Sequence, residues 1–255
     1  MRKRILLLAS LVAALAAVGA FASSQHAAAR IVASCPTVKD GQLTIGTDNP
    51  AYPPWYAGGT KTSKWKINDP ATGKGYESAV AYAIAAKLGY TKAKVSWTYV
   101  PFNRSFAPGP KSFDFDINQI SYTPARAKVV AFSKSYYDVN QAIVVNKGTK
   151  IAAVHSVAGL KSYKIGAQLG TTSYEFIKST IKPSQTPAVF NSNAAAVLAL
   201  KNKQIDGLVV DLPTAFYVTA VPGPIFGVLA FTLREPLRGS AEAAGPTIAQ
   251  RDRSI

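Results

Sequence analysis

The spacing of apolar and polar residues along the chain predicts strands that alternate with helices. In the first 100 residues, a strand is expected at 43–47, an amphipathic helix at 77–88 and a second strand at 94–100. Further strands are expected at 113–117, 141–145, 164–167 and 205–210, and further helices begin near 124, 172, 194 and 212. This alternation is typical of an α/β protein with largely parallel sheets.

Two of these segments also predict which side chains are buried. In the helix, Val80, Ile84 and Leu88 recur every four residues and therefore mark one apolar face. In the strand at 113–117, three apolar residues alternate with two aspartates, which predicts a single buried face with the aspartates on the other side. The Gly- and Lys-rich segment 57–74 is expected to be an exposed loop.

Polar residues stand at four points where an expected strand leads into an expected helix, which is where open α/β sheets bind ligands. These residues are Asp48, Ser121 with Arg126, Thr171 with Thr172, and Asp211. Thr123 before Pro124 is a helix-start signal that places Arg126 in the first turn. Thr172 and Glu175 have the spacing of a capping box.

Two of these polar residues carry opposite charges. The guanidinium of Arg126 suits a carboxylate in two-point contact, although Arg126 can also be a plain surface residue of a first helical turn. The carboxylate of Asp211 can hold an ammonium group, or it can act only as a helix cap. The residues alone leave both alternatives open.

Composition narrows the class of protein. The 255 residues include two His and one Cys, which excludes a His/Cys metal cluster and an internal disulfide. Lys and Arg number 29 against 13 Asp and Glu, a formal net charge of +16. The only dense basic groups are at 61–66 and 92–94, so the charge is expected to be a solvated surface rather than a nucleic-acid interface.

The N-terminal sequence predicts export. Three basic residues precede an apolar run from Ile5 to Phe21, and 20–22 has the small–x–small pattern of a cleavage site. Residues 1–22 are therefore expected to be a signal peptide, with cleavage after Ala29 as the alternative, and residues 23–40 a linker. The mature protein would lie in the periplasm or at the extracellular face of the cytoplasmic membrane, with a lipid anchor at Cys35 as the alternative form.

Five segments, in order, resemble one protein family. They are LTIGTDNPAYPPWY, GYESAVAYAIAAKLGY, FDFDINQISYTPARAKVVAFSKSYYDVNQAIVV, KIGAQLGTTSYEF and QIDGLVVDLPTAFY. Through them, residues 41–227 are similar to the extracellular solute-binding proteins of family 3, the amino-acid-binding components of ABC importers. The resemblance implies a two-lobed periplasmic-binding-protein fold of type II, with a ligand cleft between the lobes.

The resemblance also implies roles for individual residues. Arg126, Ser121 and Thr172 would bind the α-carboxylate of a free amino acid, and Asp211 would bind its α-ammonium. The residues implied around the ligand's side chain are Asp48, Tyr52 and Phe102, and Gln119 and Gln168 are further candidate ligand-binding residues. An acidic group with two aromatic rings favours a polar or cationic side chain. Gln119 and Val210 depart from some relatives, so no particular ligand is assigned, and no metal, cofactor or catalytic residue is expected.

The resemblance places lobe 1 at 41–139 and lobe 2 at 140–227. From about Val228 the match ends, so 228–255 is expected to be a divergent tail that replaces the family's return to lobe 1 and leaves that lobe incomplete. A truncated or frame-shifted reading is our interpretation, and genuine divergence is the alternative.

We therefore expect a monomeric binding protein, not an enzyme, that delivers a free amino acid to an ABC permease and has no nucleic-acid partner. Two alternatives remain on the sequence: a dehydratase-type enzyme with the same fold, and a basic cell-surface binding protein.

Overall fold

A computed structural model of the protein describes residues 36–62 and 64–220, together with the backbone of 226–233. The expected signal peptide at 1–22, Cys35 and the part of the expected tail at 234–255 lie outside the described residues.

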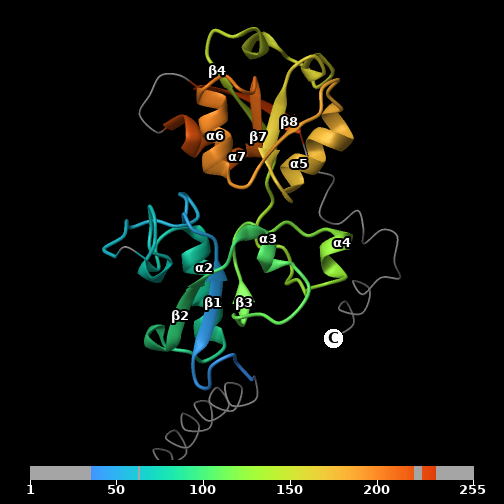
Figure 1. Ribbon diagram of the computed structural model, residues 1–255. Coiled ribbons are helices and arrows are strands. Elements are labelled where there is room, and N and C mark those ends of the chain that lie inside the picture. Colours follow the sequence, from blue (N-terminus) through green and yellow to red (C-terminus); the bar gives the residue numbers. More distant parts are fainter. Residues whose placement is uncertain (1–35, 63, 221–225, 234–255) are drawn as a thin grey trace, which may run out of the picture. The chain divides into compact units, whose positions relative to one another are not determined.

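The described residues pack into two compact units (Figure 1). Unit 1 holds residues 36–51, 55–105 and 109–118, and unit 2 holds 52–54, 106–108 and the residues from 119 onwards. Each unit combines helices with its own sheet, which confirms the α/β class and the two-lobed organisation. The segment 119–139, which is expected in lobe 1, packs with unit 2. The exact limits of the two lobes stay a prediction.

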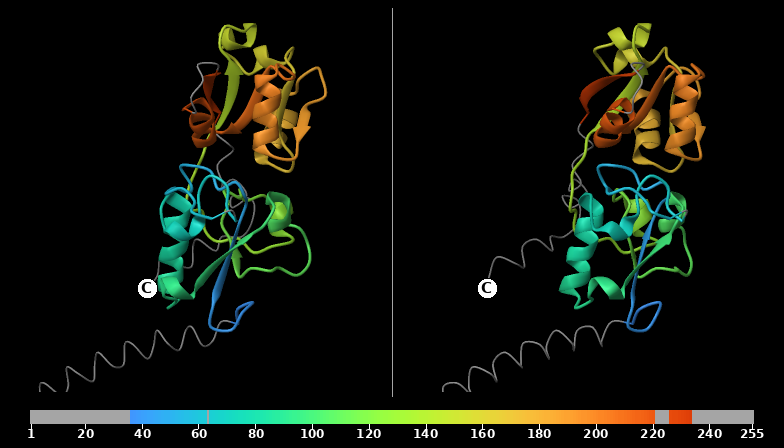
Figure 2. Two further views of the ribbon diagram at one scale, coloured as in Figure 1. Left: turned by 60° about the vertical axis from the view of Figure 1, so that its left-hand side comes forward. Right: turned by 90° about the vertical axis from the view of Figure 1, so that its left-hand side faces the viewer.

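Unit 1 is built on three parallel strands in the order β2-β1-β3. The strands are β1 (Leu43–Thr47), β2 (Val95–Tyr99) and β3 (Phe115–Asp116). The helices are α2 (Tyr76–Lys87), α3 (Phe102–Ser105), η1 (Pro70–Thr72) and η2 (Lys92–Lys94). Figure 2 shows α2 beside this sheet, against which it packs its buried side chains.

The buried face of α2 differs from the expected one. Ala81 and Ala85 face the core, whereas Ile84 is exposed and Val80 and Leu88 are only partly buried. The two alanines share one core cluster with several large aromatic side chains, and in a close-packed core small side chains complement such large ones. The helix itself lies where the sequence predicts it.

The core of unit 1 contains every tryptophan of the chain. Trp55, Trp65 and Trp97 are all buried there, with Tyr56 and Ile45 between them. Trp65 belongs to the segment expected to be an exposed loop, which is therefore anchored to the core by this ring. Tryptophan fluorescence consequently reports on the folding of unit 1 alone.

Unit 2 is built on a five-stranded sheet in the order β6-β5-β7-β4-β8. The strands are β4 (Gln141–Asn146), β5 (Ile165–Gln168), β6 (Ala188–Phe190), β7 (Gly207–Asp211) and β8 (Phe226–Leu233). The helices are α4 (Pro124–Ala127), α5 (Thr172–Phe176), α6 (Asn193–Lys201), α7 (Leu212–Ala220), η3 (Lys150–Ala153), η4 (Ala158–Leu160) and η5 (Ile177–Ile181). The sheet is mixed, not largely parallel, because β4 runs against both of its neighbours.

Helices cover both faces of this sheet (Figure 1). Ala142 and Val144 of β4 pack in the layer of α6 and α7. Ile143 and Val145 pack in the opposite layer, with α5 and η5. Alternate side chains of the strand thus serve two separate apolar cores, which is why the four residues of β4 between Gln141 and Asn146 are all apolar.

β8 is a strand that the sequence pattern does not predict. It pairs antiparallel with β4 and extends the sheet beyond the last segment that resembles the family. Among the described residues, no helix has both the length and the apolar character needed to cross a membrane.

Asp116, in β3, is not on an exposed face as the alternation predicts. Both of its carboxylate oxygens are buried, and a Cβ added at Gly46 of the neighbouring strand would lie 2.6 Å from its Oδ2 atom. Burial raises the pKa of Asp116 to about 7; the Ser105 hydroxyl opposes this shift and the buried Glu77 adds to it. Gly46 is therefore required for steric reasons, because any side chain there would displace the carboxylate.

This buried carboxyl predicts that unit 1 loses stability as the pH rises. Between the unfolded pKa of 3.8 and the folded pKa of about 7, the folded state binds more protons than the unfolded state, so the free energy of unfolding falls with increasing pH. We expect Asp116→Asn to reduce this slope and to raise the free energy of unfolding by about 1–3 kcal/mol at pH 8. Urea unfolding followed by tryptophan fluorescence at pH 4, 5.5, 7 and 8 measures it.

The exposed Asp40 provides the matched control, since Asp40→Asn is expected to leave the pH slope of unit 1 unchanged. An Asp116→Asn protein with the same pH slope as the wild type would contradict the assignment.

Candidate functional site

In unit 1, the structure brings two of the predicted site residues together. Asp48 follows β1, and Phe102 is the first residue of α3. The pKa of Asp48 is raised, chiefly because burial disfavours the charged carboxylate, while hydrogen bonds from the backbone N–H groups of Asn49 and Phe102 oppose the shift. The Asn49 hydrogen bond measures 2.7 Å. Asp48 is thus a partly buried acid fixed at the carboxyl end of the central strand.

In unit 2, Arg126 is the best-anchored charged residue of the predicted site. Thr123 caps α4 by accepting a hydrogen bond from the Arg126 backbone N–H, as the sequence predicts. The Arg126 side chain is buried, at 8% exposure, and donates from Nη1 to the Ser121 carbonyl (2.5 Å) and from Nη2 to the Gly170 carbonyl (2.6 Å). Its guanidinium also lies 4.2 Å from the centre of the Phe106 ring.

These contacts orient the guanidinium by means of neutral acceptors and an aromatic face. They distinguish Arg126 from a plain surface residue of a helical turn, because a buried guanidinium is costly unless its donors are used. The Phe106 contact is absent from the sequence-based expectations, since no spacing rule links a residue before β3 to one twenty positions later.

The junction between β5 and α5 collects several of the predicted residues. The hydroxyls of Ser121 and Thr172 are 3.4 Å apart. Gln168 ends β5, is buried, and accepts a hydrogen bond through its carbonyl from the Thr171 hydroxyl (2.7 Å). The cap of α5 is Thr171 rather than Thr172, because Thr171 Oγ1 accepts from the Tyr174 N–H. The predicted capping box is therefore wrong, because Thr172 is the first residue of the helix and Tyr174, not Glu175, stands three residues after the cap.

Asp211 ends β7 and is held by a chain of hydrogen bonds. Gln141 Nε2 donates to Asp211 Oδ1 (2.7 Å), and Ser173 Oγ donates to Gln141 Oε1 (2.6 Å). Gln141 is fully buried at 0% exposure, and Gln141 and Asp211 face each other in the register of β4 and β7. The serine fixes which way the amide points, so the amide presents its N–H to the carboxylate.

Gln141 and Ser173 are site residues that sequence reasoning misses. A signal does exist for Gln141: it is the one polar residue at the head of an apolar run, in a strand covered on both faces. Ser173 gives no such signal, because a serine in the first turn of a helix is common.

The remaining two predicted residues lie elsewhere in unit 2. Gln119 adopts a left-handed backbone conformation with φ of 49° where the chain leaves unit 1. The Tyr52 ring packs against Tyr217 of α7, with ring centroids 5.6 Å apart and a tilt of 56°. Tyr52 therefore contacts α7, whereas Ser121, Arg126 and Thr172 gather at the β5–α5 junction.

In unit 2, a cation and an anion of the predicted site are held by neighbouring residues of the chain. Gly170 contacts the cation Arg126, and Ser173 contacts the amide that holds the anion Asp211, so both charges are tied to residues 170–173, the turn into α5 with the first two residues of this helix. Among the residues that the structure describes, no group of three His, Cys, Asp or Glu side chains is arranged to hold a metal ion.

The sequence pattern of the bacterial extracellular solute-binding proteins, family 3, matches residues 43–212. The chain belongs to this family. The match includes Arg126, Thr172 and Asp211 and ends one residue after β7.

The family includes proteins of known ligand class. The chain is 29% identical over 156 residues to the ABC transporter glutamine-binding protein GlnH of Bacillus subtilis, which covers 60% of this chain and 56% of that protein. It is 29% identical over 139 residues to the ABC transporter arginine-binding protein 1 of Escherichia coli, covering 54% of each. The chain thus matches about half the length of these relatives.

Solved structures agree with this membership. An ancestral arginine-binding protein bound to glutamine has a TM-score of 0.61 and 29% identity, covering 77% of this chain and 81% of that one. An ancestral amino-acid-binding protein that is a precursor of cyclohexadienyl dehydratase has a TM-score of 0.59 and 27% identity, covering 74% and 77%. The fold therefore also occurs in the ancestry of an enzyme, and the expectation that this chain is not an enzyme stays a prediction.

The hydrogen-bond chain predicts a local loss of stability on removal of its serine. Ser173→Ala leaves the buried Gln141 oxygen without this donor, so we expect unit 2 to lose about 1–2 kcal/mol. Hydrogen–deuterium exchange should be faster in β4 and β7 of the variant. Ser179→Ala, at an exposed position of η5, is the matched control and should change neither strand. Unchanged exchange in both variants would show that the hydrogen bond from Ser173 to Gln141 contributes nothing to the stability of unit 2.

Proposed function

We propose that the chain is the extracytoplasmic substrate-binding protein of an ABC importer, which captures a free amino acid and delivers it to a membrane permease. Family membership and the relatives named for glutamine and arginine support this proposal. One observation carries it. Arg126 donates a hydrogen bond to the Gly170 carbonyl, and the hydrogen-bond chain that holds Asp211 through Gln141 begins at Ser173, so both charges are held by residues 170–173.

In this proposal, Arg126 binds the ligand's α-carboxylate. A carboxylate offers charged acceptors where the guanidinium now meets neutral carbonyls, and charge-assisted hydrogen bonds are roughly twice as strong as neutral ones. The Ser121 hydroxyl and the Thr172 backbone N–H are the neighbouring donors. The Phe106 ring keeps the guanidinium plane in place while its hydrogen-bond partners exchange.

Asp211 binds the α-ammonium in the same proposal. Its carboxylate is already oriented by Gln141, so ligand binding costs little side-chain freedom there. Asp48, Tyr52, Phe102, Gln119 and Gln168 are proposed to meet the ligand's side chain. An acid with two aromatic rings favours a polar or cationic ligand, in line with the names of the relatives.

Delivery to a permease, export from the cytoplasm and a monomeric state belong to the same proposal. The family is described as extracellular. Closure of the two lobes around the ligand stays a prediction, and it would depend on contacts of the ligand's side chain with Asp48 and Phe102 of unit 1, because Arg126 and Asp211 both belong to unit 2.

The experiment that tests the function is a thermal-shift screen of the purified mature protein against the twenty amino acids. A ligand that binds only the folded state raises the melting temperature in proportion to the logarithm of its concentration at saturation. We expect one or a few polar or cationic amino acids to raise it. If none does at 10 mM (about tenfold above a weak Kd of 1 mM), the proposal is wrong.

Removal of either charge is expected to weaken binding strongly. Truncating one partner of a buried charge pair costs about 2–5 kcal/mol, so Arg126→Ala and Asp211→Ala should each lower the affinity for the amino acid on the order of 30- to 4000-fold. Isothermal titration calorimetry measures the change, and circular dichroism verifies that each variant is folded.

Two exposed residues of the same charges are the controls. Arg104→Ala and Asp40→Ala remove a surface cation and a surface anion, and both should bind like the wild type. Retained affinity in both site variants would refute the assignment of Arg126 and Asp211.

A further inference from the structure

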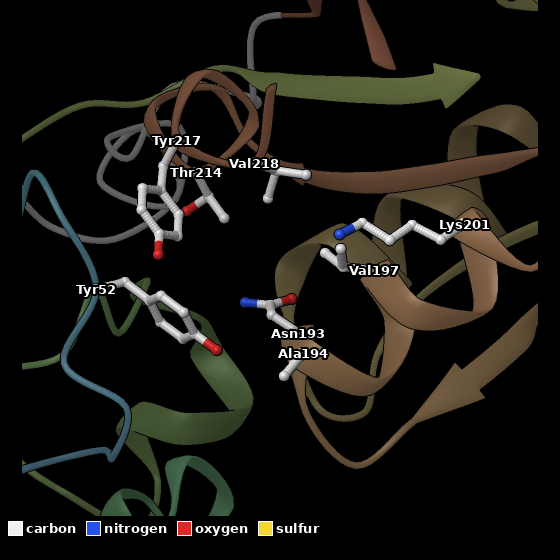
Figure 3. A pocket seen from close by; sticks show the side chains of 8 residues that line it. All are labelled: Tyr52, Asn193, Ala194, Val197, Lys201, Thr214, Tyr217 and Val218. Carbon is white, nitrogen blue, oxygen red and sulfur yellow. The ribbon is translucent and has the colours of Figure 1, made fainter. Parts of the chain in front are cut away.

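A pocket lies in unit 2 between α6 and α7. It has a volume of about 220 Å³ and is lined by residues of both helices, with Tyr52 at one side (Figure 3). Of the residues proposed to bind the amino acid, Tyr52 alone also lines this pocket, and the residues proposed for the two charges of the amino acid do not. The lining residues are Tyr52, Asn193, Ala194, Val197, Lys201, Thr214, Tyr217 and Val218.

The helical repeat explains why these side chains meet. Asn193, Val197 and Lys201 are four residues apart on α6 and therefore lie on one face of the helix. Thr214, Tyr217 and Val218 are three and four residues apart on α7 and form the facing wall. The opposite sides of both helices pack on the sheet through Ala196, Leu200 and Ala215, so the pocket is held by a rigid layer.

The chemistry of the walls selects a class of ligand. Most of the wall is apolar: Ala194, Val197 and Val218 with the rings of Tyr52 and Tyr217, which are 5.6 Å apart. The polar groups are the Asn193 amide, the Thr214 hydroxyl and the Lys201 ammonium. In Figure 3 the Lys201 ammonium reaches back toward Val197 and Val218. The wall has a positive charge and no carboxylate.

We propose that this pocket binds a small organic anion with a single ring-sized apolar body, an aromatic monocarboxylate. An apolar cavity of about 150 Å³ holds one benzene ring, so a volume of about 220 Å³ leaves space for the ring and one carboxylate. The ring packs between Val197, Val218 and the tyrosines, and the carboxylate meets the Lys201 ammonium and the Asn193 amide. An ammonium group on the ligand has no counter-charge among the lining residues, so the pocket favours a simple anion over the zwitterion of the proposed amino-acid site, with which it shares Tyr52.

The ligand probes are benzoate, benzylamine and phenylalanine, added to the full mature protein. We expect benzoate to shift the backbone amide signals of α6 and α7 in ¹H–¹⁵N NMR spectra, with a dissociation constant on the order of 0.1–1 mM for so small a ligand. Benzylamine should shift none of these signals. Shifts of α6 and α7 that saturate equally with benzylamine, or benzoate shifts scattered over surface lysines, would overturn the proposal.

Variants locate the binding. Ala194→Leu, at an exposed position, and Val197→Phe both fill the pocket and should weaken benzoate binding more than about tenfold, a change of 1.4 kcal/mol. Lys201→Met should weaken it about three- to tenfold, because the ion pair is partly exposed to water. Lys161 is exposed and is not among the residues that line the pocket. Lys161→Met is therefore the matched control and should leave benzoate binding unchanged.

Two variants fill the pocket so that a folding defect in one does not decide the result. The amide spectrum of each variant shows whether it is folded, and unchanged benzoate affinity in the folded variants refutes the site. Phenylalanine separates this proposal from the proposed function. If phenylalanine competes with benzoate at α6 and α7, the pocket is an amino-acid site and the anion proposal fails. If Arg126→Ala loses amino-acid binding but still binds benzoate, the two ligands bind at two independent sites.

Discussion

The hydrogen bond from Gln141 to Asp211 is the constraint on which the site of unit 2 depends. It joins the first residue of β4 to the last residue of β7, across two strands that run in opposite directions. Because β4 is covered on both faces, a glutamine there is fully buried and must have its amide satisfied. Ser173 supplies one of these hydrogen bonds from α5. The anion, the sheet and the helix are thus fixed by the same two hydrogen bonds.

The guanidinium of Arg126 is held by other contacts, one of them to Gly170, close to Ser173 in the chain. Arg126 comes from a helix of four residues, which by itself positions a side chain poorly. The carbonyls of Ser121 and Gly170 and the ring of Phe106 provide the order that the short helix lacks. In the proposed function, a guanidinium whose plane is held in this way would lose little side-chain freedom on binding a carboxylate, which lowers the entropic cost of binding.

The sequence predicts much of the fold because most elements carry local signals. The Thr123–Pro124 start of α4 and the position of α2 follow from such signals and are confirmed. The face of α2 is not predictable from spacing, because the aromatic residues that fill the core come from other segments. The burial of Asp116 is likewise set by Gly46 on a neighbouring strand. The charged residues of the site are found by their type, whereas Gln141, Ser173 and Phe106 become visible only when the strands are paired.

The position of β8 has a consequence for how the second sheet can come apart. β8 takes the outer place next to β4, and the three-residue β6 takes the opposite margin. Local opening of a sheet begins at its margins, where each strand has a single neighbour. Local opening of either edge strand therefore leaves β4 and β7 paired with each other. The hydrogen bonds between these two inner strands keep the Asp211 carboxylate in place while the edge strands open and close.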